Sequence, residues 1–353
     1  MKAPRFPSRH HDRTRWLVRC TMAVGLFILL GPTPWADVAP PPVDHRQLLS
    51  ATAVVYPQTA GAVRTVGALD YREGWVLESN YTGFGGFSGM AMLGPRRFLL
   101  AADTGLLTGF TLSPEGKITH PFIAPVPDGP GDPRDKFNRD MESLTASSDG
   151  TTFWVGFEHT NAIWKYRTAF SVVSGSSYPP LMHDWPDNGG AEAMTRLADG
   201  RFLVFSESAG DDPRGFAAIL FLGDPTEAPD AAIPFFYDPQ GKGKPTDAVQ
   251  LPDGRILILH RKLSIWEGFR SSIAIADIRG IEKDTVLHSQ TIAEIAPPNI
   301  AENFEGMTLE REGQEWMLWM ISDNNQNHYQ RTLLVKYRIK PELLEPPDAG
   351  LGQ

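Results

Sequence analysis

The sequence predicts an all-β protein, a β-propeller of five or six four-stranded blades. Three observations indicate this fold. Short apolar runs alternate with turn signals, 33 glycines and 30 prolines disfavour long helices, and a segment of about 50 residues recurs along the chain. A hairpin-led unit of this length, repeated around a closed circle, is typical of a propeller blade. The alternative is an irregular β-sandwich with accidental internal similarity.

Five segments carry the repeat, and each opens a predicted β-hairpin. Their first residues are 54, 50, 55 and 58 positions apart, and a large apolar side chain follows two positions after each. Asp-Gly pairs at 149–150, 199–200 and 253–254 predict tight primed turns between the hairpin strands. A sixth unit could combine residues 62–78 with a terminal strand at 332–339, which would also close the circle.

The ends of the chain differ from this repeating region. A basic segment precedes an apolar run from Met22 to Leu30, so residues 1–36 are predicted to be a signal peptide, with an uncleaved membrane anchor as the alternative. Residues 37–60 are a predicted Pro-rich linker, residues 61–342 the propeller domain, and residues 343–353 a C-terminal tail. The protein is therefore expected in the periplasm or outside the cell, with no transmembrane domain unless the first segment remains as an anchor.

The formal net charge is −9, and loss of residues 1–36 would make it −14, because six basic residues and one acidic residue leave with them. Such a chain repels nucleic acid and anionic lipid and suits cations, so the sequence argues against nucleic-acid binding. Cys20 is the only cysteine. A mature chain would therefore contain no disulfide.

Polar residues recur at both ends of each predicted hairpin. A hairpin returns the chain to the end where it began, so the start of its first strand neighbours the end of its second. The sequence therefore predicts eight carboxylates and one guanidinium around one mouth of the central channel. The pairs are Ser88 with Asp103, Glu142 with Glu158, Glu192 with Glu207, Asp247 with Arg261, and Glu305 with Asp323.

Clustered carboxylates repel one another, and cations among them reduce that cost. Oxygen ligands without cysteine or clustered histidine favour Ca²⁺, with Mg²⁺ as the second choice. The predicted metal ligands are Glu142, Glu192, Asp247, Glu305 and Asp323, with neutral oxygen donors nearby at Asn324 and Asn325. The alternative is that these acidic residues cap turns or face water.

Other polar residues near the same mouth are candidates for chemistry on a substrate. Glu158, Glu207 and His159 could transfer protons. Arg261 could either neutralise the carboxylates or grip an anionic group in a bidentate manner, and the sequence leaves both roles open. Further candidates for substrate contacts are Ser88, His260 and Asn325.

Several motifs resemble the phytase-like, or esterase-like, domain of bacterial exported proteins, over residues 80 to 340. They are Ser88-Gly89 with Asp103, Asp140-Met-Glu142, Glu192-Ala-Met, Leu257-Ile-Leu-His-Arg261, Asn303-Phe-Glu305-Gly306-Met307 and Ser322-Asp323-Asn324-Asn325. The resemblance implies a β-propeller with calcium-assisted phosphoesterase or esterase activity. It carries over as site residues Asp103, Glu142, Glu192, Arg261, Glu305, Asp323 and Asn324, so Asp103 and Asn324 join the expected metal ligands. The dense basic set that inositol hexakisphosphate would require is missing near these motifs.

The leading hypothesis is an exported hydrolase that uses calcium to cleave a small anionic ester, with Arg261 binding the anion. A metal-dependent lactonase or carboxylesterase of the propeller type is the second hypothesis. The third is a calcium-stabilised propeller that binds an envelope partner without catalysis. The sequence makes no prediction about the oligomeric state.

Overall fold

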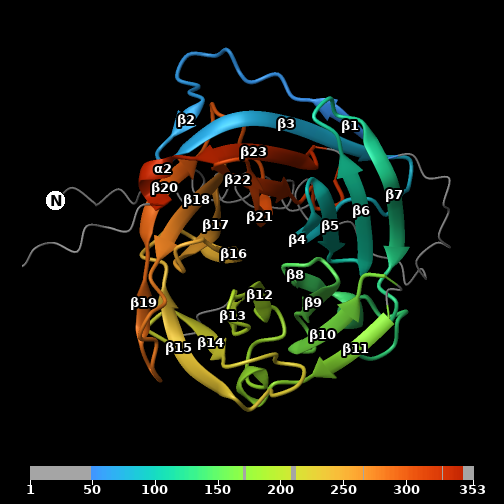
Figure 1. Ribbon diagram of the computed structural model, residues 1–353, viewed down its shortest axis with the longest axis vertical. Coiled ribbons are helices and arrows are strands. Elements are labelled where there is room, and N and C mark those ends of the chain that lie inside the picture. The colour runs from blue at the N-terminus through green and yellow to red at the C-terminus, as the bar shows by residue number, and fades with distance from the viewer. Residues whose placement is uncertain (1–48, 170–171, 208–211, 265, 328, 345–353) are drawn as a thin grey trace, which may run out of the picture. The chain divides into compact units, whose positions relative to one another are not determined.

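The computed structural model describes residues 49–169, 172–207, 212–264, 266–327 and 329–344. All of them belong to one of the chain's two compact units, Asp37–Gln353. The predicted signal peptide, the first part of the predicted linker and most of the predicted tail lie outside the described residues. Figure 1 shows the sheets of this unit arranged as blades around a common centre.

The propeller has five blades, and each contains four antiparallel strands from the centre outwards. From the innermost strand outwards, the first blade contains β4 (Phe87–Gly94), β5 (Arg97–Ala102), β6 (Leu106–Leu112) and β7 (Ile118–Pro125), and the second contains β8 (Met141–Ala146), β9 (Thr152–Phe157), β10 (Ala162–Arg167) and β11 (Val172–Ser177). The third blade contains β12 (Ala191–Arg196), β13 (Phe202–Ser206), β14 (Phe216–Phe221) and β15 (Ala232–Asp238), and the fourth contains β16 (Lys244–Gln250), β17 (Ile256–Ser264), β18 (Gly268–Ala276) and β20 (Gln290–Ile295). The fifth blade contains β21 (Phe304–Glu312), β22 (Glu315–Ser322), β23 (Leu333–Ile339) and β3 (Leu69–Ser79).

The fifth blade joins the two ends of the propeller. Its three inner strands, β21 to β23, come last in the chain, and β3 from the beginning of the propeller pairs antiparallel with β23. The segments considered for a sixth blade therefore complete the fifth, as the blue and red strands in Figure 1 show. The prediction of propeller architecture is confirmed, with five blades.

Short elements extend the outer edges of the blades. β1 (Leu49–Ala53) and β2 (Thr65–Val66) pair with β3, and β19 (Val286–His288) adds a parallel strand to β15. The 3-10 helices η1 (Lys136–Arg139) and η2 (Pro180–Met182) and the short α2 (Pro341–Leu344) lie in connections or at the end. The predicted linker therefore contributes a strand, and its Tyr56 is buried against Tyr71 at a ring-centroid distance of 4.6 Å.

The core consists of five apolar clusters, each lying between two neighbouring blades. Alternate residues of one strand enter different clusters. On β13, for example, Leu203 and Phe205 pack towards the fourth blade, whereas Phe202 and Val204 pack towards the second. Because both faces of each inner strand are buried, these strands appear in the sequence as continuous apolar runs rather than alternating ones.

The inner hairpins turn with one glycine in the left-handed region. The φ angles are +65° at Gly150, +90° at Gly200 and +92° at Gly254. The preceding aspartates do not have positive φ. Each instead accepts a hydrogen bond from the backbone N–H two residues later, as Asp253 does from Arg255 at 2.9 Å. The predicted hairpins are present, but the two-residue primed turn expected of Asp-Gly is not the turn used.

Every inner hairpin carries a β-bulge at the same place, near the start of its first strand. Each shift of register skips one residue, and those residues are Ser88, Glu142, Glu192, Thr246 and Glu305. A bulge redirects the extra side chain out of the regular pleat. The sequence alignment of the fourth repeat was therefore wrong by one position, because Thr246 rather than Asp247 is the equivalent residue.

The residue after each bulge faces the neighbouring blade. Ser143 Oγ donates to the Ala191 carbonyl at 2.7 Å, and Asp247 Oδ2 accepts the N–H of Met307 at 2.6 Å. Gly306 has the same position in the fifth blade, where a Cβ atom would lie 2.9 Å from the backbone nitrogen of Met90. The inner strands thus approach so closely that this position holds a small side chain or one that bonds the next blade.

Asp247→Asn should lower the free energy of unfolding by about 2 kcal/mol, because an amide replaces a carboxylate that accepts two buried N–H groups, from Ala248 and Met307. Chemical denaturation measures the change, with the exposed Asp230→Asn as the control. Equal stability of the two variants would show that the contact between the fourth and fifth blades does not depend on this carboxylate.

Candidate functional site

Eight carboxylates gather at one end of the inner strands, and we call them the acidic ring. Three occupy bulges, four follow the second strand of a blade, and one precedes β8. They are Glu142, Glu192 and Glu305; Asp103, Glu158, Glu207 and Asp323; and Asp140. All are buried or half-buried. The bulge and the closing end of each hairpin thus bring together residues about 15 positions apart in the sequence.

Burial and mutual repulsion disfavour the ionised form of these acids. Burial and then the charge of Glu192 raise the pKa of Glu142 well above its ordinary value. Burial and then Glu207 do the same to the pKa of Glu192. Burial together with Glu305 raises the pKa of Asp323. The interaction of Glu142 with Glu192 joins the second and third blades, whereas the other two interactions each lie within one blade.

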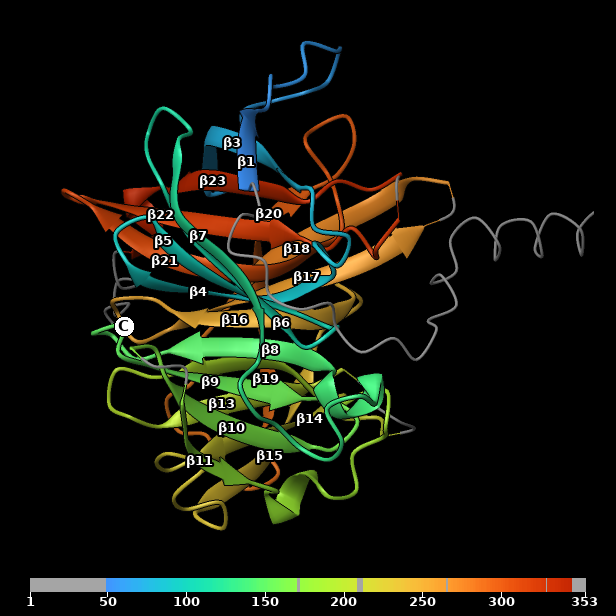
Figure 2. The same cartoon turned by 90° about the vertical axis from the view of Figure 1, so that its right-hand side faces the viewer.

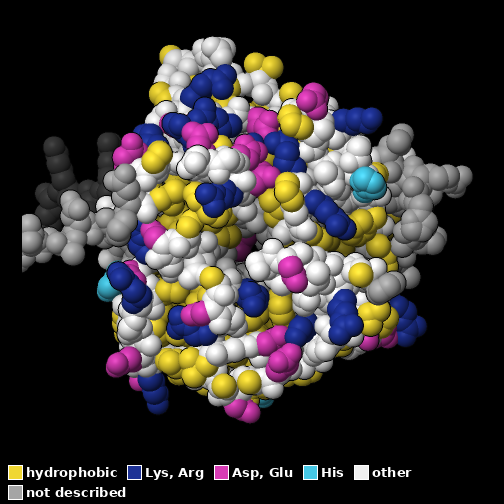
Figure 3. Space-filling model, in the orientation of Figure 1, with side chains coloured by type: hydrophobic (Ala, Val, Ile, Leu, Met, Phe, Trp, Pro, Cys, Tyr) yellow, Lys and Arg dark blue, Asp and Glu magenta, His cyan; other side chains and the backbone are white. Residues whose placement is uncertain are grey.

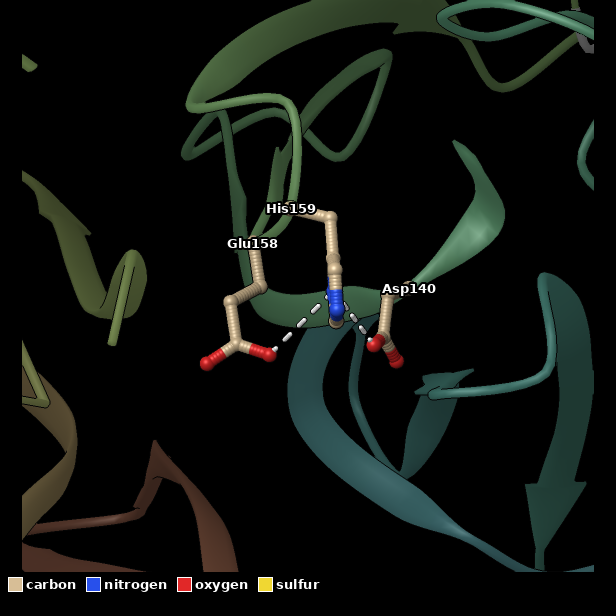
Figure 4. A group of neighbouring side chains, drawn as sticks. All are labelled: Asp140, Glu158 and His159. Carbon is tan, nitrogen blue, oxygen red and sulfur yellow. Dashed lines mark ion pairs between the residues drawn. The ribbon is translucent and has the colours of Figure 1, made fainter. Parts of the chain in front are cut away.

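One group of possible metal ligands combines Asp140, Glu158 and His159 (Figure 4). His159 Nδ1 lies 3.0 Å from Asp140 Oδ2 and 3.6 Å from Glu158 Oε2. The imidazole packs on Phe137 of η1 at a centroid distance of 4.6 Å. Because Asp140 precedes β8 and Glu158 follows β9, the inner hairpin of the second blade holds all three residues.

A second group combines Glu158 with Glu192 and Glu207 of the third blade. One oxygen from each of these carboxylates lies within 4.8 Å of the others. Burial, then repulsion from Asp140 and Glu207, raises the pKa of Glu158 to about 7. Glu158 therefore connects the two groups.

Arg261 is the least exposed of three cations in the described residues that contact the acidic ring; the others are Lys136, at Asp103, and Lys244, whose Nζ lies 2.8 Å from Glu207 Oε2. The two terminal nitrogens of Arg261 contact Glu305 and, at 3.1 Å, Glu207, and Asn303 lies 3.3 Å from one of them. The charge of Glu305 raises the pKa of Arg261 further above its ordinary value. Of the two roles left open by the sequence, the structure shows the neutralising contact directly, while the side chain remains 26% exposed.

The loop after β22 arranges the polar residues of the fifth blade. Asn303 donates to Glu305 at 2.7 Å and to Asp323 at 3.3 Å. Asp323 in turn accepts the N–H of Asn325 at 2.7 Å. Asn324 Oδ1 accepts the N–H of Gly86 at 3.0 Å, which ties this loop to the first blade.

Asp103 has one engaged oxygen and one free oxygen. Lys136 Nζ lies 3.3 Å from Oδ2, while the buried Oδ1 has no hydrogen-bond partner in the described residues. Burial raises the pKa of Asp103 to about 6, against the opposing charge of Lys136. A buried carboxylate oxygen without a partner is a position where a cation or a water would be favourable.

Two predicted site residues have places that the sequence did not indicate, and a third lies where it was expected. Asp247 points between blades, as described above. His260 is fully buried, with Nε2 2.5 Å from the Tyr237 hydroxyl and Nδ1 3.1 Å from the Ser272 carbonyl. A substrate contact at His260 would therefore require the fourth blade to open. Ser88 occupies its expected place, at the bulge of the first blade.

The sequence analysis did not select Asp140, Thr246 or Lys136 as site residues. Asp140 lies two positions before Glu142, and residues at this spacing share one face of an extended chain, so the signal was present. Thr246 was not selected because the adjacent Asp247 matched the acidic pattern of the repeat. Lys136 lies in the connection between the first two blades, and no repeat pattern marks it.

Outside the acidic ring, a recurring local ion pair joins aspartate and arginine. Five aspartates pair with an arginine two positions later; they are Asp132, Asp199, Asp212, Asp253 and Asp277. Figure 3 shows basic and acidic side chains interspersed on the face it presents.

Within the described residues, no helix has the length and apolar character needed to cross a membrane. The predicted signal segment itself lies outside this part of the chain.

Comparison with known proteins adds one informative match. The family model named Phytase-like and described as "Esterase-like activity of phytase" matches residues 82–326. No curated protein matches the sequence. Among solved structures, hydrazine synthase of Kuenenia stuttgartiensis is similar at 11% identity and a TM-score of 0.38, over 69% of this chain and 78% of that one. A chain of a mitotic checkpoint complex is similar at 10% identity and a TM-score of 0.38, over 82% and 75%.

Glu158→Gln should raise the melting temperature of the metal-free protein at pH 8 and leave it nearly unchanged at pH 4. Folding raises the pKa of Glu158 to about 7, so the stability gained from its proton is complete below about pH 4.5 and is lost as the pH rises through 7. Glutamine mimics the protonated side chain and removes that loss. Thermal unfolding in EDTA tests this, with the exposed Glu282→Gln as the control; a lower melting temperature at pH 8 would contradict it.

Proposed function

The chain belongs to the phytase-like family, and from this premise we propose that it is an exported, calcium-assisted hydrolase of ester bonds whose active site is the acidic ring. The observation that carries the proposal is the position of Glu158, whose carboxylate belongs to both three-residue groups of possible metal ligands. Two such groups sharing a member bring cation binding and proton transfer to adjacent positions.

The residues of the acidic ring fit a calcium ion. The donors are carboxylate and amide oxygens, which calcium prefers, and Asp103 offers a buried oxygen without a partner. The raised pKa values of Glu142 and Glu192 express a repulsion that a cation would relieve. Asp140, Glu158, Glu192 and Glu207 would hold the ion. Bound calcium would supply positive charge that polarises an ester oxygen and acidifies nearby water.

The chain's own residues divide the remaining tasks. Arg261, oriented by Glu305 and Glu207, binds the negative oxygens of the substrate with its partly exposed guanidinium. Proton transfer falls to Glu158, Glu207 or His159, which lie around the two ligand groups. The substrate is accordingly a small anionic ester, such as a phosphate monoester, met in the periplasm or outside the cell.

A second candidate function is a carboxylesterase or lactonase, and the contacts of Arg261 favour it. Both terminal nitrogens of Arg261 already contact carboxylates, which limits their capacity for a doubly charged phosphate. A neutral ester would make no such demand. A panel of phosphate monoesters, carboxylic esters and lactones distinguishes the two functions.

Glu192→Gln should weaken calcium binding at least about tenfold and reduce ester hydrolysis by a similar factor or more, because it removes one charge from a group of three carboxylates. Glu192 is a cleaner choice than Glu305, which also holds Arg261 in place. Calorimetric titration of the EDTA-treated protein and initial rates on the ester panel provide the measurements, with Glu282→Gln as the control.

Three outcomes decide the proposal. Saturable calcium binding together with hydrolysis that depends on Glu192 supports it. Binding without hydrolysis of any ester replaces it with a calcium-stabilised binding propeller. Absence of binding at millimolar calcium would show that the acidic ring serves neither role.

A further inference from the structure

The hairpin of β17 and β18 in the fourth blade extends further than its counterparts in the other blades. In those blades the second strand ends just before the ring residue, as β9 ends before Glu158, whereas β17 continues past Arg261 to Ser264. The turn to β18 therefore lies beyond the level of the acidic ring. Figure 2 shows this hairpin, in orange, projecting past the inner strands of the other blades. We call residues 262–264 and 266–270 the projecting hairpin.

The tip of the projecting hairpin exposes two large apolar side chains. Trp266 is 89% exposed, more than any other large apolar side chain of the described residues, and Leu263 is 56% exposed. The Trp266 N–H donates to Ser264 Oγ at 3.3 Å, so the turn has a hydrogen bond of its own. Single exposed apolar residues are common, but two at the end of one protruding element indicate contact with another surface.

One face of the projecting hairpin carries two opposed cations. Lys262 and Arg270 are directly paired residues of β17 and β18. Paired residues of an antiparallel sheet share one face, and like charges in this arrangement destabilise the pair. Arg270 is offset by Glu267 and Glu294, each at 3.1 Å, but Lys262 has no ion-pair partner in the described residues. An anion between the two cations would therefore be favourable.

A pocket of about 280 Å³ lies between this face and the segment that leads into β16. Its lining includes three cations, from Lys242, Lys262 and Arg270, and two carboxylates, from Glu267 and Glu294. The side chains of Glu267 and Glu294 are 63% and 52% exposed, so both carboxylates stay accessible to a ligand. Charges of both signs in one small pocket match a ligand that itself carries an anion and a cation.

Charge and apolar exposure together select the kind of partner. The formal net charge of the protein is −9, and the acidic ring lies at the same end as the projecting hairpin, so an anionic bilayer would be repelled. A soluble zwitterion would fill the pocket but leave Trp266 and Leu263 in water. A zwitterionic phospholipid bilayer meets both demands, because it offers phosphate and ammonium groups above an apolar layer.

We propose that the projecting hairpin docks the protein on a zwitterionic phospholipid surface. Trp266 and Leu263 enter the boundary between head groups and acyl chains. Lys262 and Arg270 bind the phosphate of one head group, and the two carboxylates of the pocket bind its ammonium group. The inference does not depend on ester hydrolysis. Docking in this orientation turns the acidic ring towards the membrane surface.

Sedimentation of the full protein with vesicles tests the docking. Vesicles of phosphatidylethanolamine and phosphatidylcholine should bind the protein more strongly than vesicles of phosphatidylglycerol. Trp266→Ala should weaken binding to the zwitterionic vesicles about tenfold, and Lys262→Glu about fivefold. Tyr329→Ala, at a tyrosine that is 80% exposed after β22, and Lys283→Glu, at an exposed lysine, are the matched controls and should bind as the unchanged protein does.

A second measurement reports on the hairpin itself. Phospholipids brominated on their acyl chains quench the fluorescence of tryptophans that reach the apolar layer. This quenching should fall in Trp266→Phe, while the variant still binds the vesicles because phenylalanine keeps an apolar ring at the tip. All variants carry the same residues 1–36, so any contribution of that segment to vesicle binding is common to them.

The outcomes separate this inference from the proposed function. Docking that depends on Trp266 and Lys262 supports it, whether or not any ester is cleaved. It is overturned if Trp266→Ala and Tyr329→Ala bind vesicles alike, or if phosphatidylglycerol vesicles bind more strongly than zwitterionic ones. A higher KM for ester hydrolysis in Trp266→Ala, at unchanged vesicle binding, would also overturn it and would assign the hairpin to the substrate site.

Discussion

Five inner strands converge on one centre, and their close approach is the constraint on which the other features depend. Neighbouring inner strands pack so closely that a Cβ at Gly306 would lie 2.9 Å from the backbone of the next blade. Regular strands continued to this end would direct polar side chains into that contact. The bulge at Ser88, Glu142, Glu192, Thr246 and Glu305 avoids this, because each extra residue leaves the pleat and turns away from the neighbouring blade.

The convergence of the inner strands also brings like charges close together at the candidate site. Carboxylates redirected by different blades come near one another in a buried place, where their charges are poorly screened. Arg261 offsets part of this charge through Glu305 and Glu207, Lys244 through Glu207, and Lys136 through Asp103. Burial and neighbouring carboxylates nevertheless raise the pKa values of Glu142, Glu158 and Glu192. The fold thus stores an unfavourable interaction at the position where the possible metal ligands gather.

Most of the fold could be predicted from the sequence, because apolar runs, Asp-Gly turns and the spacing of acidic residues all report on the same inner hairpins. The fourth repeat was misaligned since Thr246 and Asp247 are adjacent and a bulge leaves no mark in sequence. The alternation of side chains along a strand could have predicted the burial of His260. If Arg261 faces the acidic ring, the preceding His260 must face the opposite side, where it is buried. The contacts of Lys136 come from the connection between the first two blades, which the repeat does not describe.

The pairing of β3 with β23 has a consequence for how the protein is made. A chain synthesised from its N-terminus presents β3 long before β23 exists, so the fifth blade stays incomplete until nearly the whole chain has emerged. Until then, the open edge of β3 and the apolar faces of the first blade lack their partners. If the chain is exported during its synthesis, as proposed above, it begins to cross the membrane before its circle can close, and the two ends first meet on the far side.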